Sequence, residues 1–183
     1  MKDKKVFAID PAAHITGPYI EKLQTKIDII YLPIAVLPHD DTDSCKITRF
    51  YVAANSLSSS LYADTTTSKQ VVCPAFDFSV VMRSLLDFNL ISPGTNVALR
   101  MNCEGAELAI VQSIQTCDVT LKNIIGSIGD VGKKHGGKAE RQMLRILKHE
   151  NIKFDYFKGS DPSTWLSGFN LLDQSQSSTS SIT

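Results

Sequence analysis

Three short polar stretches come directly after apolar segments, and their side chains could bind hydroxyl groups or move a proton. They are Asp10-Pro11, Asn102-Cys103-Glu104 and Gly129-Asp130. A carboxylate in such a place can accept hydrogen bonds from a hydroxyl group or remove its proton. The middle stretch has the most polar groups, because VALRMNCEGAEL sets an Asn and two carboxylates between two apolar runs.

Apolar runs and segments of helical periodicity alternate along the chain and must position these groups. The β-branched and apolar runs predict strands over residues 6–9, 27–36 with an interruption at Pro33, 46–52, 70–74 as a short edge strand, 97–101, 121–128 and 152–157. Apolar spacing of three and four residues predicts helices over residues 78–88, 105–114 and 138–149.

This alternation indicates a fold of the α/β class, a mostly parallel sheet with helices on both faces. In such sheets, ligands bind outside the carboxyl ends of the strands. The three polar stretches would then line one edge of the sheet, which makes that edge the expected binding site.

Composition narrows the class of protein. The chain has 183 residues and balances 19 Lys and Arg against 19 Asp and Glu, so we expect no nucleic-acid partner. The first apolar run is too short for a signal peptide or a membrane span, so we expect a cytoplasmic protein without a membrane partner. We expect one domain over residues 1–172 and a polar, flexible tail over residues 173–183.

The cysteine and histidine spacings predict neither a disulfide framework nor a metal site. The four cysteines form no CxxC pair, and the histidines share no ligand spacing with them. We expect all four to be reduced, partly buried thiols.

The segment LRMNCEGAELAIVQSI resembles the signature of the FkbM family of S-adenosylmethionine-dependent methyltransferases, in which a strand ends in a Lys-Ile-Asp-Val-Glu-Gly-Ala-Glu-like motif and leads into a helix. Other pieces resemble the family in the same order: KVFAIDP, YLPIAVLPHDD, NSLSSSLY and FDFSVVMRSLL. The similarity runs over residues 5–112. It implies a Rossmann-like methyltransferase fold that binds S-adenosylmethionine.

Two departures from the family pattern bear on activity. No good copy of the family's Gly-Ala-Asn-x-Gly-like turn precedes Lys5, so the sheet is expected to lack the family's first strand. An alternative alignment reads DPAAHITGPY as a degenerate form of that turn, but Pro11 and Ala12 stand where close backbone approach favours Gly. Asn102 stands where the family has Asp, so the negative charge is lost there. Arg100 in place of Lys is the milder change.

The resemblance implies methylation of a hydroxyl group on a sugar or another hydroxylated small molecule. It implies that Asp10 holds the cofactor ribose, that Pro11 and Asn102 also line the cofactor, and that Glu104 and Asn102 are the catalytic residues at the methyl acceptor. The alternative is a catalytically inactive methyltransferase-like binding module or an N-terminally truncated fragment. The oligomeric state and any metal requirement stay open.

Each of these residues also has a purely structural interpretation. Asp10 can cap a turn and Asn102 can cap a helix. Glu104 and Glu107 can be first-turn acids that the helix dipole favours, and for Glu107 this interpretation is preferred to a catalytic one. Residues 126–137 (GSIGDVGKKHGG) lack the order of a phosphate-binding loop, so we expect a flexible loop there, with His135 exposed to solvent.

Overall fold

The computed structural model describes residues 5–37, 44–53, 61, 67–101, 103 and 105–156. Asn102, Glu104 and the tail over residues 173–183 lie outside the described residues. The elements in chain order are β1 (Val6–Ile9), α1 (Ala13–Gln24), β2 (Ile29–Leu32), β3 (Ala35–Val36), β4 (Cys45–Ala53), β5 (Thr67–Phe76), α2 (Phe78–Asp87), β6 (Asn96–Met101), α3 (Glu107–Ile114), β7 (Thr120–Gly126), α4 (Gly129–His135), α5 (Gly137–His149) and β8 (Lys153–Tyr156).

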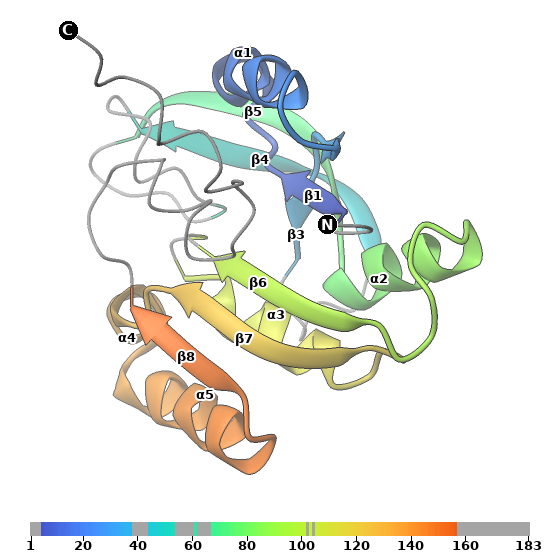
Figure 1. The fold of residues 1–183 in the computed structure, drawn as a ribbon. Coiled ribbons are helices and arrows are strands. Elements are labelled where there is room, and N and C mark those ends of the chain that lie inside the picture. Colours follow the sequence, from blue (N-terminus) through green and yellow to red (C-terminus); the bar gives the residue numbers. More distant parts are fainter. Residues whose placement is uncertain are drawn as a thin grey trace, which may run out of the picture.

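The strands form three sheets in the described part of the chain (Figure 1). β1 pairs with β2, β5 lies between β3 and β4, and β7 lies between β6 and β8. All these pairings are parallel except that of β4 with β5. The α/β class and the mostly parallel pairing are therefore confirmed, whereas the strands are divided among three sheets instead of one.

Pro33 explains one of these divisions. The apolar run over residues 27–36 is interrupted there, as predicted, and its two halves join different sheets: β2 pairs with β1 and β3 pairs with β5. Proline has no N–H for a strand ladder, and the residue before it is restricted. One run of sequence thus links two sheets.

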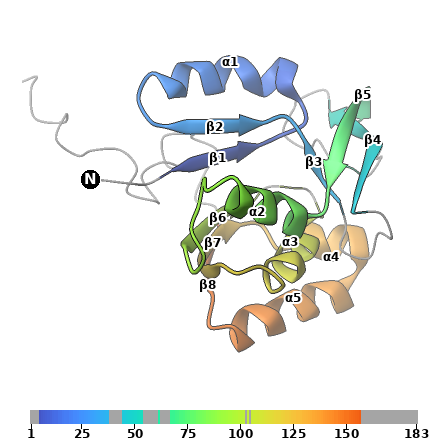
Figure 2. The same ribbon diagram turned by 90° about the vertical axis from the view of Figure 1, so that its right-hand side faces the viewer.

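The main core lies on one face of the β6-β7-β8 sheet. β6 alternates, with Val97, Leu99 and Met101 packed into the core while Ala98 is exposed. Helices α2, α3, α4 and α5 all contribute buried residues to the same core, and Figure 2 shows them gathered on one side of these strands. Helix α1 packs against β2 instead. Within the described ranges, the four core helices therefore cover one face of this sheet, which differs from the two-faced arrangement expected from the sequence.

The segment expected to be a flexible loop is helical. Residues 129–135 form α4, which has Asp130 in its first turn and Lys133, Lys134 and His135 in its last. The acid lies at the positive, N-terminal end of the helix dipole and the basic residues lie at its negative end, so both stabilise the helix. Gly136 ends it with a φ of 81°, a conformation that favours glycine.

Two other expectations concern the cysteines and the membrane. The four cysteines are free thiols; Cys73 is buried and Cys103 and Cys117 are partly buried, whereas Cys45 is exposed, which differs from the expectation. None of the helices in the described ranges combines the length and the apolar character needed to cross a bilayer.

Candidate functional site

The site is built on the ends of two parallel strands, β6 and β7. Met101 is the last residue of β6 and is paired with Gly126, the last residue of β7. A Cβ atom added to Gly126 would lie 2.9 Å from the backbone oxygen of Met101, a distance that real Cβ atoms essentially never show. Glycine at this position lets the two strand ends approach each other. The connections from β6 to α3 and from β7 to α4 both start here.

Glu107 holds the connection from β6 to α3. Its side chain is completely buried at the first residue of α3. One carboxylate oxygen accepts the N–H of Cys103 at 2.9 Å, and the other accepts the N–H of Gly105 at 2.8 Å. These two donors flank position 104 on both sides. The clamp, by which we mean the Glu107 carboxylate with these two N–H groups, therefore fixes the backbone of Cys103 and Gly105.

Burial raises the pKa of the Glu107 carboxyl above its usual value. The hydrogen bonds from the N–H groups of Glu107 itself, Cys103 and Gly105 act in the opposite direction, and the charge of nearby Asp130 adds to the rise. Desolvation disfavours the charged form and is the largest of these effects.

His135 joins α4 to the same connection. Its ring Nε2 lies 2.9 Å from the backbone oxygen of Gly105. A carbonyl oxygen only accepts, so the ring must donate from Nε2. Asp130, at the other end of α4, pairs with Lys133 at 2.9 Å. Glu107 thus holds Cys103 and Gly105 by their N–H groups, and His135 holds Gly105 by its carbonyl oxygen.

Asp10 follows β1, as predicted, and caps the turn into α1. One of its carboxylate oxygens accepts the N–H of Ala12 at 2.7 Å. The other carboxylate oxygen makes no hydrogen bond within the described part of the chain. The Tyr31 hydroxyl donates to the backbone oxygen of Asp10 at 2.8 Å, and burial followed by the charge of Asp10 raises the pKa of Tyr31 to about 12.

The predicted site residues fall into two groups. Asp10 and the half-buried Pro11 lie on the β1-β2 sheet, next to the start of α1. No hydrogen bond or ion pair among the described residues joins Asp10 to Glu107, Asp130 or His135. The other two predicted residues, Asn102 and Glu104, lie outside the described residues, on the connection that the clamp holds.

Sequence reasoning missed the role of Glu107. It was expected as a first-turn acid, which is confirmed, but its complete burial and its reach back to Cys103 and Gly105 were not expected. A signal was present in ELAIVQSI, since a helix that is apolar nearly all round is buried and any carboxylate in it needs partners.

A shallow hollow of about 470 Å³ lies elsewhere, over the β4-β5 hairpin. Its lining residues are Ile47, Thr48, Arg49, Tyr51, Leu61 and Val72. It holds no carboxylate and none of the predicted site residues, so we do not assign the site to it. Within the described ranges, no three His, Cys, Asp or Glu side chains lie close enough together to hold a metal ion.

Comparison with known proteins gives no relative for this chain: no family model, no curated protein and no solved structure matches it.

Proposed function

We propose that the protein is an S-adenosylmethionine-dependent methyltransferase of the FkbM type, with a Rossmann-like fold. Its substrate would be a hydroxyl group on a sugar or another hydroxylated small molecule. The observation that supports this most is the Glu107 clamp. It lies in the segment that resembles the family signature, and it fixes the connection at the carboxyl end of a parallel strand, where α/β proteins bind ligands.

Asp10 suits the proposed cofactor role. One carboxylate oxygen is used for the turn, and the second is available to accept hydrogen bonds from two vicinal hydroxyl groups such as those of a ribose. Pro11 and Asn102 would complete the contact with the cofactor. S-adenosylmethionine, when bound, would supply an electrophilic methyl group.

The chemistry that remains for the chain is orientation and proton removal. A new C–O bond forms to the acceptor oxygen as the C–S bond of the sulfonium breaks, and the hydroxyl proton must leave. We assign proton acceptance to Glu104, with Asn102 as a hydrogen-bond partner of the acceptor. Glu107 is a positioning residue, because its hydrogen bonds hold the two neighbours of Glu104. We expect this chemistry to take place in the cytoplasm.

Transfer of a labelled methyl group to a panel of sugars tests the proposal. Glu104→Gln should lower the rate about 10²- to 10⁴-fold, the usual contribution of a general base. Glu21→Gln, on the exposed surface of α1, is the matched control and should leave the rate unchanged. A folded chain that binds S-adenosylmethionine and methylates no member of the panel would contradict the proposed reaction.

A second candidate is a methyltransferase-like module without catalysis. It is favoured by the separation of the β1-β2 sheet from the β6-β7-β8 sheet, which places Asp10 and the clamp on different sheets. Cofactor binding that is insensitive to Glu104→Gln, together with no transfer to any acceptor, would favour this candidate.

A further inference from the structure

Positive charge is concentrated on one face of α5, although the whole chain is neutral. Lys138, Arg141, Arg145 and Lys148 are all exposed. At about 100° per residue, their positions fall within an arc of about 80° and extend over about 15 Å of the helix. We call these four residues the α5 basic stripe.

The cations of this stripe have no counterion among the described residues. No hydrogen bond or ion pair of the described chain involves their side chains. Neighbouring cations do have counterions, since Lys133 pairs with Asp130 and Lys153 pairs with Asp155. The acid within α5, Glu140, packs towards Gly132 of α4, away from the stripe. The charge of the stripe is therefore locally uncompensated.

An apolar side chain lies beside these charges. Leu144 is 45% exposed and sits next to Arg141 and Lys148 on the helix surface. The apolar face of α5 is a different one, because Met143 and Leu147 are buried in the core. The helix can thus present the stripe and Leu144 to a partner without leaving the core.

Contrary to the expectation from the sequence of no membrane partner, we infer that the α5 basic stripe, together with Leu144, is a docking surface for an anionic lipid bilayer. A line of exposed cations along one helix face suits a planar anionic surface, and clusters of four or more Lys and Arg on an amphipathic helix are typical of such binding. Leu144 can enter the interfacial region, where an apolar side chain is favoured. A nucleic acid fits less well, because the arc contains no aromatic side chain on which a base could stack.

Co-sedimentation of the full chain with lipid vesicles tests this inference. The protein should bind phosphatidylcholine vesicles that contain about one third phosphatidylserine at about 0.1 M salt, and it should be released at about 1 M salt. It should not bind phosphatidylcholine alone. Arg141→Gln combined with Arg145→Gln should weaken binding about 25-fold, at about fivefold for each cation.

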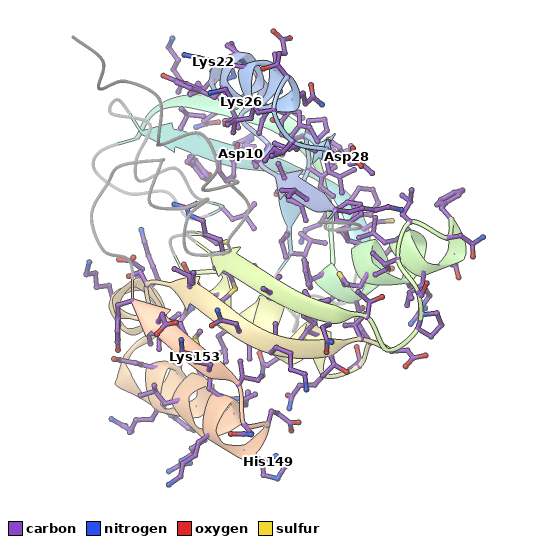
Figure 3. The ribbon with its side chains drawn as sticks, in the orientation of Figure 1. Asp10, Lys22, Lys26, Asp28, His149 and Lys153 are labelled. Atoms are coloured by element: carbon purple, nitrogen blue, oxygen red, sulfur yellow. The ribbon has the colours of Figure 1, made fainter. Side chains whose placement is uncertain are left out.

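The matched control is Lys22→Gln on α1 combined with Lys26→Gln in the turn that follows it, which makes the same change of charge at exposed positions. Figure 3 shows these two lysines on the opposite side of the molecule from His149 at the end of α5. The control should bind as the unchanged chain does, and circular dichroism should show both double variants folded.

Three results would overturn the inference. The first is absence of binding to the anionic vesicles, and the second is an equal loss of binding in the Lys22 and Lys26 control. The third is displacement of the protein from the vesicles by single-stranded RNA at matched phosphate concentration. The last result would assign the stripe to nucleic acid. Because none of these residues belongs to the proposed methyltransferase site, the two proposals can fail separately.

Discussion

At the scale of single residues, Glu107 is the most constrained group described at the candidate site. A buried carboxylate is costly unless its oxygens are hydrogen-bonded, and Glu107 meets this need with backbone N–H groups of Cys103 and Gly105. The arrangement resembles a capping box, in which a side chain in the first turn reaches back to N–H groups that precede the helix. One residue therefore stabilises both the start of α3 and the connection before it.

Replacing Glu107 with Gln should destabilise the fold. The amide has the same shape but only one acceptor oxygen, so one of the two N–H groups loses its partner at a buried position. The expected loss in the free energy of unfolding is about 1–3 kcal/mol, measured by urea denaturation. Glu21→Gln on exposed α1 should change it little. Equal stability of the two variants would contradict the clamp.

The raised pKa of Glu107 predicts a pH dependence of stability with a definite sign. The folded state binds the proton more tightly than the unfolded state does, because burial raises the pKa of this carboxyl. Its contribution to stability is therefore complete below the ordinary pKa of a Glu and is lost as the pH rises through the raised value.

The difference in unfolding free energy between the unchanged chain and Glu107→Gln isolates this contribution from those of the other carboxylates. This difference should be measured by urea denaturation across the acidic range. Between the ordinary pKa of a Glu and the raised pKa of Glu107, the unchanged chain should lose stability relative to the variant as the pH rises. A difference that stays constant with pH would be inconsistent with the raised pKa.

At the scale of elements, Asp77 joins two helices of the core. One of its carboxylate oxygens accepts the N–H of Ser79 at the start of α2, and the other accepts the hydroxyl of Ser113 in α3 at 3.3 Å. Asp77→Ala should lower the free energy of unfolding by about 0.5–2 kcal/mol, the usual range for an N-cap. Thermal or urea unfolding measures it. Asp87→Ala, at the exposed last residue of α2, should be neutral or slightly stabilising, because the helix dipole disfavours an acid at the C-terminal end of a helix.

Gly136 separates α4 from α5 in a conformation that is nearly exclusive to glycine, with φ 81° and ψ 163°. Gly136→Ala should therefore cost about 1–3 kcal/mol of stability. Gly129→Ala, at the exposed first residue of α4 and with nothing within 4 Å of the added Cβ, should be neutral or stabilising by up to about 1 kcal/mol. Unfolding of both variants under the same conditions makes the comparison. If Gly136→Ala were as stable as Gly129→Ala, the turn would not depend on this backbone conformation.

Most elements could be predicted from the sequence, because their local signals are strong. Helices α2 and α5 follow their apolar periods and lie within one residue of the expected bounds. The helix α4 was not predicted, because its glycines suggested a loop while its stabilising charges sit at its ends. β7 ends at Gly126, earlier than expected, since the apolar residues Ile128 and Val131 continue the pattern but belong to the turn and to α4.

At the scale of the whole molecule, the sequence predicts which strands are parallel but not how they are divided among sheets. Pairing of distant strands depends on packing that no local window contains, and Pro33 marks a break without indicating that β2 and β3 join different sheets. The candidate site was predicted at strand ends, and Asp10 and the β6 connection are at strand ends. The clamp by Glu107 was not predicted, because its partners are backbone groups that the sequence does not distinguish.

The proposed function requires that the chain bind S-adenosylmethionine through Asp10, and calorimetric titration tests this most directly. We predict micromolar binding, on the order of 8 kcal/mol of binding free energy, that is lost in Asp10→Ala. Asp28→Ala is the matched control. Asp28 precedes β2 at the opposite end of the same two-stranded sheet, and Figure 3 labels both residues. Retained binding in this control would assign the loss to the Asp10 carboxylate. Absence of binding by the folded chain, or equal binding by both variants, would contradict the proposed cofactor site.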